Sequence, residues 1–139
     1  MPDGIPLLYL HRGPGSGLGS DGWRATYDTG RHLVVALDQR GCGASRPLVI
    51  DTPASLATNN TQTLIDDLEA LREHLGFNDW VVAGVSWGTA LALAYALAHR
   101  ERVRTLLLVA VSTTSREEVD WLTEQMGRMF PEGQNARTR

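Results

Sequence analysis

A serine between two glycines is the residue in this sequence best placed to do chemistry. Gly84, Ser86 and Gly88 belong to the pattern Gly-Val-Ser-Trp-Gly, which follows an apolar run over 80–83 and precedes another over 89–98. In a strand–turn–helix setting the chain turns sharply at the serine and presents its hydroxyl at the end of the strand. The helix then points its N-terminus at the site, where developing negative charge is stabilised. This pattern predicts a nucleophilic serine that forms an acyl-enzyme.

A plainer interpretation is that Ser86 caps a helix and that the glycines only allow a tight turn, as in a nucleotide-binding unit. That unit requires the pattern G-x-G-x-x-G and an acidic residue about 20 positions later. The sequence around Ser86 has neither feature. The nucleophile is therefore the favoured interpretation.

A serine nucleophile also needs two backbone N–H groups that converge on the oxyanion. We expect Trp87, which follows the nucleophile, to supply one of them. The loop His-Arg-Gly-Pro-Gly over 11–15 would supply the other, and Gly13 is its best donor, since Pro14 has no N–H. The alternative for this loop is a plain turn beside a buried His11.

Four apolar runs and the helical periodicity between them predict the elements that position these residues. The expected strands cover 5–10, 32–37, 80–85 and 103–111, and their continuous apolar runs predict that all four are buried. The expected helices cover 61–75, 89–98 and 117–129. Asn60 or Thr61 can cap the first helix, Gly76 can end it, Phe130-Pro131 would close the last one, and the polar tail over 132–139 is expected to be loose. The alternation predicts an α/β class with a mostly parallel sheet. Ligands bind beyond the carboxyl ends of such strands, where the loops after 10, 37 and 85 would meet.

The first of these helices has a polar face that is predicted to be solvated rather than catalytic. It carries Asp66, Asp67, Glu69, Arg72 and Glu73. Charged residues opposite an apolar stripe are typical of a helix that packs on a sheet with its outer side in water.

Composition excludes several other function classes. The chain has 139 residues, a net charge of -3 and one cysteine, Cys42. These values give no basic surface for nucleic acid and no intramolecular disulfide. The apolar runs are too short to cross a membrane, and the N-terminus lacks the pattern of a signal peptide. No metal-ligand cluster and no phosphate-binding loop is present, so we expect a soluble cytoplasmic protein without a cofactor.

Three motifs occur in the order of a known family: His-Arg-Gly-Pro-Gly over 11–15, Asp-Gln-Arg-Gly-Cys-Gly over 38–43, and Gly-Val-Ser-Trp-Gly over 84–88. Together the motifs resemble those of prolyl aminopeptidases (proline iminopeptidases) of the α/β-hydrolase fold, and the similarity extends over about residues 7 to 132. The resemblance implies a partial α/β-hydrolase core with a nucleophile elbow. It implies a peptide substrate with an N-terminal proline, attacked by Ser86 with a histidine as base and an aspartate that orients it.

The resemblance also assigns roles to neighbouring residues. It implies that His11, Gln39 and Arg40 shape or order the site rather than react, and a small buried residue is the favoured role for Cys42. The family usually has glycine where this chain has Arg12, and an arginine at a positive φ would cost about 1–2 kcal/mol. Val85 also replaces a glycine, a change that other hydrolases tolerate.

The base and the acid of the triad have no candidate in this chain. They should follow the serine, but the only later histidine is His99, at the far end of a helix about 20 Å long. We therefore expect residues 1–139 to form a single incomplete domain that lacks the cap and the C-terminal triad segment and is inactive alone. Its open sheet edges could pair with another copy. The alternatives are another esterase of this fold and a non-catalytic remnant.

Overall fold

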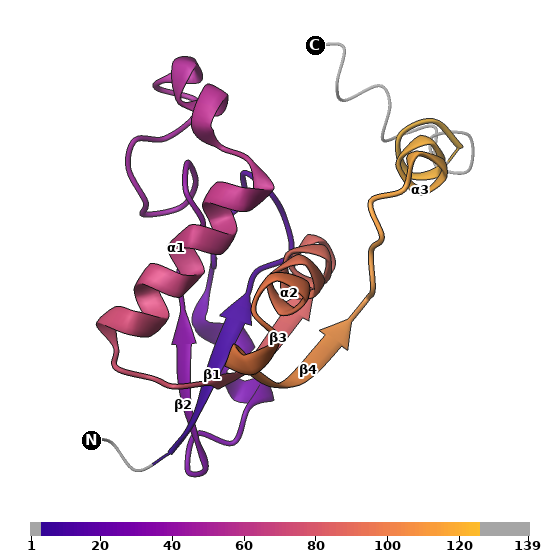
Figure 1. Cartoon of the computed structure of the whole chain (residues 1–139). Helices are drawn as coiled ribbons and strands as arrows, with labels where there is room; N and C mark the ends of the chain where they lie inside the picture. The colour runs from indigo at the N-terminus through magenta and orange to yellow at the C-terminus, as the bar shows by residue number, and fades with distance from the viewer. Residues whose placement is uncertain (1–3, 126–139) are drawn as a thin grey trace.

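The computed structural model describes residues 4–125, which form one parallel sheet with helices. Its strands are β1 (Ile5–Leu10), β2 (His32–Ala36), β3 (Trp80–Val85) and β4 (Val103–Val109), in the order β2-β1-β3-β4. Every neighbouring pair is parallel, so all carboxyl ends lie at one edge (Figure 1). The α/β class expected from the sequence is confirmed.

Two longer helices cover one face of the sheet, namely α1 (Thr61–His74) and α2 (Trp87–Ala98) (Figure 1). Asn60 caps α1 by accepting a hydrogen bond from the N–H of Thr63, and Gly76 follows the helix with a φ of 72°. Both ends of α1 therefore agree with the sequence prediction. None of the described helices is long and apolar enough to span a bilayer.

Shorter helical turns complete the connections: η1 (Asp21–Thr26), η2 (Pro53–Thr58), η3 (Arg100–Arg102), α3 (Arg116–Asp120) and the π turn η4 (Trp121–Gln125). The helix expected over 117–129 is thus α3 and η4 as far as residue 125. Its predicted closure at Phe130-Pro131 and the tail over 132–139 lie outside the described residues.

The two faces of the sheet carry separate apolar clusters. Leu8, Leu10, Trp80 and Val82 pack under α1 and α2, with Leu68, Leu91 and Tyr95 from those helices. Leu7, Tyr9, Val81 and Ala83 form the second cluster, against which Trp23 of η1 packs. The alternation along β1 and β3 divides the core in this way, because successive side chains of a strand point to opposite faces.

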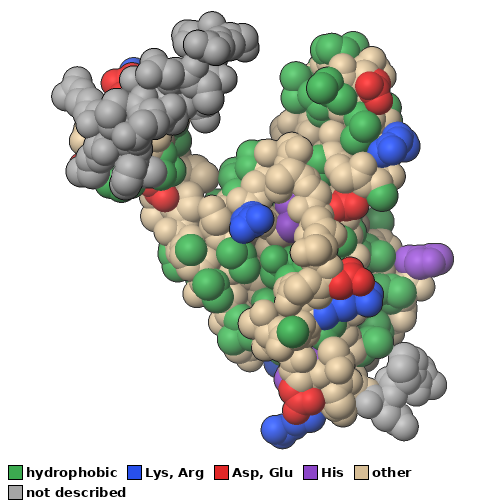
Figure 2. Space-filling model, turned by 180° about the vertical axis from the view of Figure 1, so that it is seen from behind, with side chains coloured by type: hydrophobic (Ala, Val, Ile, Leu, Met, Phe, Trp, Pro, Cys, Tyr) green, Lys and Arg blue, Asp and Glu red, His purple; other side chains and the backbone are tan. Residues whose placement is uncertain are grey.

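The edge strands are less buried than the sequence predicts. The residues of β2 are all half-buried, and on β4 the side chains of Leu107 and Val109 are 42% and 57% exposed. Figure 2 shows hydrophobic side chains along the side of the molecule that β4 forms. The expectation of four fully buried strands was therefore wrong for β2 and β4, since each has a neighbour on one side only in the described sheet.

The prediction of a wholly solvated polar face on α1 was also wrong. The Arg72 and Glu69 side chains are 6% and 16% exposed, and two hydrogen bonds of 2.9 and 2.8 Å join the guanidinium to the carboxylate. The hydroxyl of Tyr95 on α2 donates to the same carboxylate, and the Trp80 Nε1–H donates to that hydroxyl at 3.2 Å. This network joins α1, α2 and β3 on the face of the sheet that the two helices cover.

Candidate active site at the nucleophile elbow

Ser86 occupies a strained backbone position between β3 and α2. Its φ of 53° and ψ of -121° lie in a region that residues with a side chain rarely adopt. The Ser86 N–H donates to the Val109 carbonyl at 3.0 Å, and the Ser86 carbonyl accepts from the N–H of Thr89 at 2.8 Å and from its hydroxyl at 2.6 Å. These bonds hold a conformation that costs of order 1–3 kcal/mol.

Glycines leave the space for this turn. A Cβ on Gly84 would lie 2.8 Å from the Thr89 nitrogen and closer still to the Gly88 carbonyl oxygen. A Cβ on Gly88 would lie 2.9 Å from the His11 carbonyl oxygen and closer still to that of Leu10. Strand β3, helix α2 and the end of β1 therefore approach one another at distances that only glycine permits.

The two predicted oxyanion donors lie on these neighbouring segments. Trp87 is the first residue of α2, so its N–H has no partner within the helix. Gly13 is in a turn closed by the Ser16 N–H, which donates to the Gly13 carbonyl at 3.4 Å. Arg12 does not have the positive φ considered above, because Ser86, Ala110 and Thr114 are the described non-glycine residues with one. The arginine therefore enters the loop without that strain, and the oxyanion assignment itself stays a prediction.

His11, Gln39 and Trp87 connect the three loops at the carboxyl edge. The Gln39 N–H donates to His11 Nε2 at 3.2 Å, and the Trp87 Nε1–H donates to Gln39 Oε1 at 3.1 Å. His11 is 1% exposed, and burial lowers its pKa, although the charge of Asp38 and the Gly13 backbone act in the opposite direction. Since Nε2 accepts a hydrogen bond, the neutral ring carries its proton on Nδ1, and no acceptor in the part of the chain that the structure describes meets hydrogen-bond geometry there. This arrangement orders the loops and leaves Nε2 occupied, which is unsuited to a base.

Cys42 completes this network as a buried residue. Its thiol donates to the Gln39 carbonyl at 3.0 Å, and burial raises its pKa. A protonated, 3% exposed thiol is a packing residue rather than a nucleophile.

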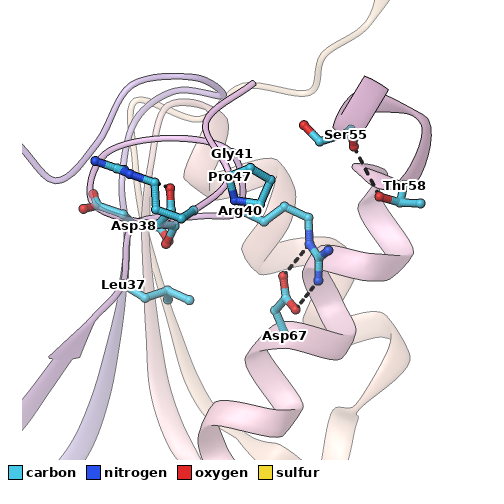
Figure 3. A pocket seen from close by; sticks show the side chains of 10 residues that line it. Leu37, Asp38, Arg40, Gly41, Pro47, Ser55, Thr58 and Asp67 are labelled. Carbon is cyan, nitrogen blue, oxygen red and sulfur yellow. Dashed lines mark hydrogen bonds and ion pairs between the residues drawn. The ribbon is translucent and has the colours of Figure 1, made fainter. Parts of the chain in front are cut away.

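Arg40 points away from the elbow. Its guanidinium makes hydrogen bonds of 2.9 and 2.6 Å to the two carboxylate oxygens of Asp67 on α1, and this bond to Asp67 raises the arginine pKa (Figure 3). The pair lines a hollow of about 440 Å³ between α1 and the loop after β2, with Leu37, Asp38, Ser55 and Thr58 on its other sides. Arg40 thus shapes a pocket other than the one expected at Ser86.

Asp38 is a positioning residue that the sequence reasoning left unassigned. Its carboxylate accepts from the N–H of Leu18 at 2.6 Å and from that of Ala44 at 2.8 Å, and so joins the loop after β1 to the loop after β2. A Cβ on Gly43 would overlap this carboxylate. Burial alone would raise the Asp38 pKa, but the N–H bonds from Ala44 and Leu18 lower it overall. The glycines that flank these loops were the available signal, because they mark a close approach.

Replacing Asp38 with asparagine is expected to lower the free energy of unfolding at pH 7 by about 1–3 kcal/mol, since one amide cannot accept both N–H bonds as well as a carboxylate. Because the pKa of Asp38 is lower in the folded state than in the unfolded state, its carboxylate stabilises the folded protein at pH values above the unfolded pKa. This contribution is lost as the pH falls below about 4. The difference between wild type and variant in urea unfolding should therefore shrink from pH 7 to pH 3. A difference that is the same at both pH values would contradict this role.

Thr89 was also missed by the sequence reasoning. It is fully buried, and its hydroxyl donates to the Ser86 carbonyl and accepts from the N–H of Ser112 at 2.9 Å. It thereby ties the elbow to the loop after β4, which leads to α3. A threonine at the start of an apolar helix gives no sign of this contact in the sequence alone.

The four histidines of the sequence are all described, and none of them forms a hydrogen bond with Ser86. His99 follows α2 and packs on Tyr95, with ring centroids 5.4 Å apart, at the end of the helix opposite to the serine. Within residues 4–125, no group of three metal-ligating side chains is present.

The sequence is similar to known hydrolases over nearly its whole length. A family model described as "alpha/beta hydrolase fold" matches residues 5–136. A Streptomyces coelicolor protein named "Probable proline iminopeptidase" is 45% identical over 131 residues, which are 94% of this chain and 40% of that protein. The proline iminopeptidase of Neisseria meningitidis serogroup A is 43% identical over 133 residues, again 94% of this chain and 41% of that protein.

The fold is also that of a solved hydrolase. A marine microorganism esterase superimposes with a TM-score of 0.62 at 23% identity, over 82% of this chain and 42% of the esterase. The present chain spans about 40% of the length of the curated relatives it matches. The family match, together with the parallel sheet and the elbow at Ser86, shows that the chain belongs to the alpha/beta hydrolase fold family.

Proposed function

We propose that Ser86 is the nucleophile of a prolyl aminopeptidase that releases N-terminal proline from peptides. The observation that carries the proposal is the positive φ of Ser86, since such strain on a residue with a side chain is typical of functional sites. The names of the relatives supply the substrate class. The glycine contacts around the elbow support the same role, because they keep the strand, the helix and the loop at 11–15 together.

In the proposed reaction, Ser86 Oγ attacks the carbonyl carbon of the N-terminal proline while a base accepts the hydroxyl proton. The N–H groups of Trp87 and Gly13 would stabilise the oxyanion. The proton passes to the leaving amine as the peptide bond breaks, and water then releases proline from the ester and restores the serine.

The base is the part of this reaction that the described residues do not supply. All four histidines lie within the described residues, and none of them forms a hydrogen bond with Ser86. Loss of the triad base costs about 10⁶ in kcat in a serine protease. We therefore propose that the 139-residue chain by itself acylates slowly and does not turn over amide substrates.

The test uses the purified 139-residue chain with proline nitrophenyl ester and added imidazole as an external base. We expect a single prolyl group on Ser86, detected by intact-mass and peptide mass spectrometry, because slow deacylation lets the acyl-enzyme accumulate. The Ser86→Ala variant should remain unmodified. Nitrophenyl acetate, the control substrate without proline, should acylate Ser86 at least tenfold more slowly than the proline ester. Equal rates for both esters would favour a general esterase, while a folded chain that is never acylated would be a non-catalytic remnant.

Hydrolysis of a proline arylamide without imidazole is the complementary measurement. Turnover that disappears in Ser86→Ala would show that a base comes from this chain or from a second copy, against the proposal. A size-exclusion run on the same sample separates these two sources. Copies would pair through β4, because its outer edge is unpaired in the described sheet and its Leu107 and Val109 are exposed. We also propose a cytoplasmic location, which the free thiol of Cys42 permits.

A further inference from the structure

A second hollow at the carboxyl edge of the sheet lies on the face opposite to α1 and α2. Its volume is about 550 Å³, and it is lined by Tyr9 and His11 of the β1 end, by Arg12, and by Trp23 of η1. Val85, the residue before Ser86, closes one side. The hollow therefore adjoins the elbow without including the serine.

One wall of this hollow is aromatic and preorganised. The rings of Tyr9 and Trp23 are stacked, with centroids 4.7 Å apart and planes within 2° of each other. Tyr27 meets Tyr9 edge-on, with ring centroids 6.0 Å apart. Tyr9 is only 8% exposed, and the Arg24 guanidinium carbon lies over Trp23 at 5.5 Å from the ring centroid. The wall therefore offers the edges of a fixed stack rather than a free ring face, with little conformational entropy left to lose on binding.

The charge of the lining is positive. Arg12 is exposed and forms no salt bridge within residues 4–125, and the lining contains no aspartate or glutamate. Trp23 Nε1 and His11 Nδ1 are buried nitrogens of lining residues that have no hydrogen-bond partner among the described residues. Unpaired N–H donors favour negative charge nearby, and a guanidinium pairs with carboxylate groups in particular.

Two carboxylates lie beside this lining, and both already have partners. Asp21, between the lining residues Ser20 and Gly22, pairs with Arg24 at 3.8 Å. Asp38 interacts electrostatically with His11, but its two oxygens accept from the N–H groups of Leu18 and Ala44. The carboxylate is thus engaged by the loops, and it lines the other hollow beside Arg40.

We propose that the hollow formed by Tyr9, His11, Arg12, Trp23 and Val85 binds a carboxylate carried on a small aromatic or apolar body. Arg12 pairs with the carboxylate, and the body lies against the aromatic wall. This inference goes beyond the proposed hydrolysis, because it needs neither acylation of Ser86 nor a base.

The test is a titration of the ¹⁵N-labelled 139-residue chain with phenylacetate, and with phenylacetamide as the uncharged analogue of the same shape. We expect the indole N–H of Trp23 and the amides of Arg12 and Gly17 to shift with phenylacetate. Binding of phenylacetamide should be about tenfold weaker, and added salt should weaken phenylacetate binding.

Two arginine variants make the test specific. Arg12→Gln should lower the affinity for phenylacetate about tenfold, to that of the amide. Arg31→Gln removes another exposed arginine, just before β2 at the opposite end of the sheet, and should leave the affinity unchanged. Ser86→Ala should also bind normally, which separates this site from the proposed function. Equal affinities for acid and amide, shifts that avoid Trp23, or full affinity in Arg12→Gln would each overturn the proposal.

Discussion

Gly88→Ala is expected to destabilise the domain by about 3 kcal/mol or more, a large part of the stability of a small protein. The new Cβ would lie 2.9 Å from the His11 carbonyl oxygen and closer to that of Leu10. Both obstacles are backbone atoms of β1 and the loop after it, so no side chain can rotate away. The methyl group can be accommodated only if α2 moves off the sheet, which would also displace Ser86.

Urea unfolding followed by circular dichroism measures this effect. Gly22→Ala is the matched control, because Gly22 lies in η1 with an ordinary φ and its Cβ would meet only the Ser20 hydroxyl, at 3.9 Å. The control should unfold within about 0.5 kcal/mol of the wild type. If both variants were equally stable, the close approach of β1 and α2 would be refuted.

Arg72→Met is expected to cost about 3–5 kcal/mol at pH 7, since removing one partner leaves a largely buried carboxylate unpaired. In the wild type the hydrogen bonds from Arg72, and secondarily that from Tyr95, lower the Glu69 pKa from 4.5 to about 2 against the effect of burial. The guanidinium also donates to the Phe77 carbonyl after α1, and that acceptor would lose its partner too.

The pH dependence distinguishes this mechanism from a simple loss of packing. A carboxylate with a lowered folded pKa stabilises above its unfolded pKa, and the stability is lost as the pH falls from about 4.5 towards 2. Arg72→Met should remove this dependence, so the two proteins should differ less at pH 3 than at pH 7 in urea unfolding.

The control for this prediction is Arg104→Met. Arg104 pairs with Asp79 at 2.6 Å, but the two side chains are 51% and 33% exposed. An exposed pair is worth less than about 1 kcal/mol, so this variant should stay close to the wild type at both pH values. A loss in Arg72→Met no greater than in Arg104→Met would mean that burial adds nothing to the pair.

The parts of the site that follow from local sequence were predictable. Ser86 between two glycines, with a strand before it and a helix after it, specifies the turn, because the backbone there needs space that only small neighbours leave. The motif over 38–43 marks a second loop in which glycine leaves room for a close contact, here between Gly43 and the Asp38 carboxylate. The partners of Asp38 and Thr89 were not predictable, because Leu18 and Ser112 are 20 and 23 positions away.

By itself, the sequence determined the α/β class, the ends of α1 and the place of the elbow, all of which depend on periodicity and on residues a few positions apart. Only the tertiary structure decided which strands are edges, and hence that Leu107 and Val109 are exposed. It also decided that Arg72 is buried against Glu69 and Tyr95 and that Arg40 turns to Asp67. Burial and pairing of this kind depend on which elements become neighbours in space, and the order β2-β1-β3-β4 is not contained in the pattern of any single element.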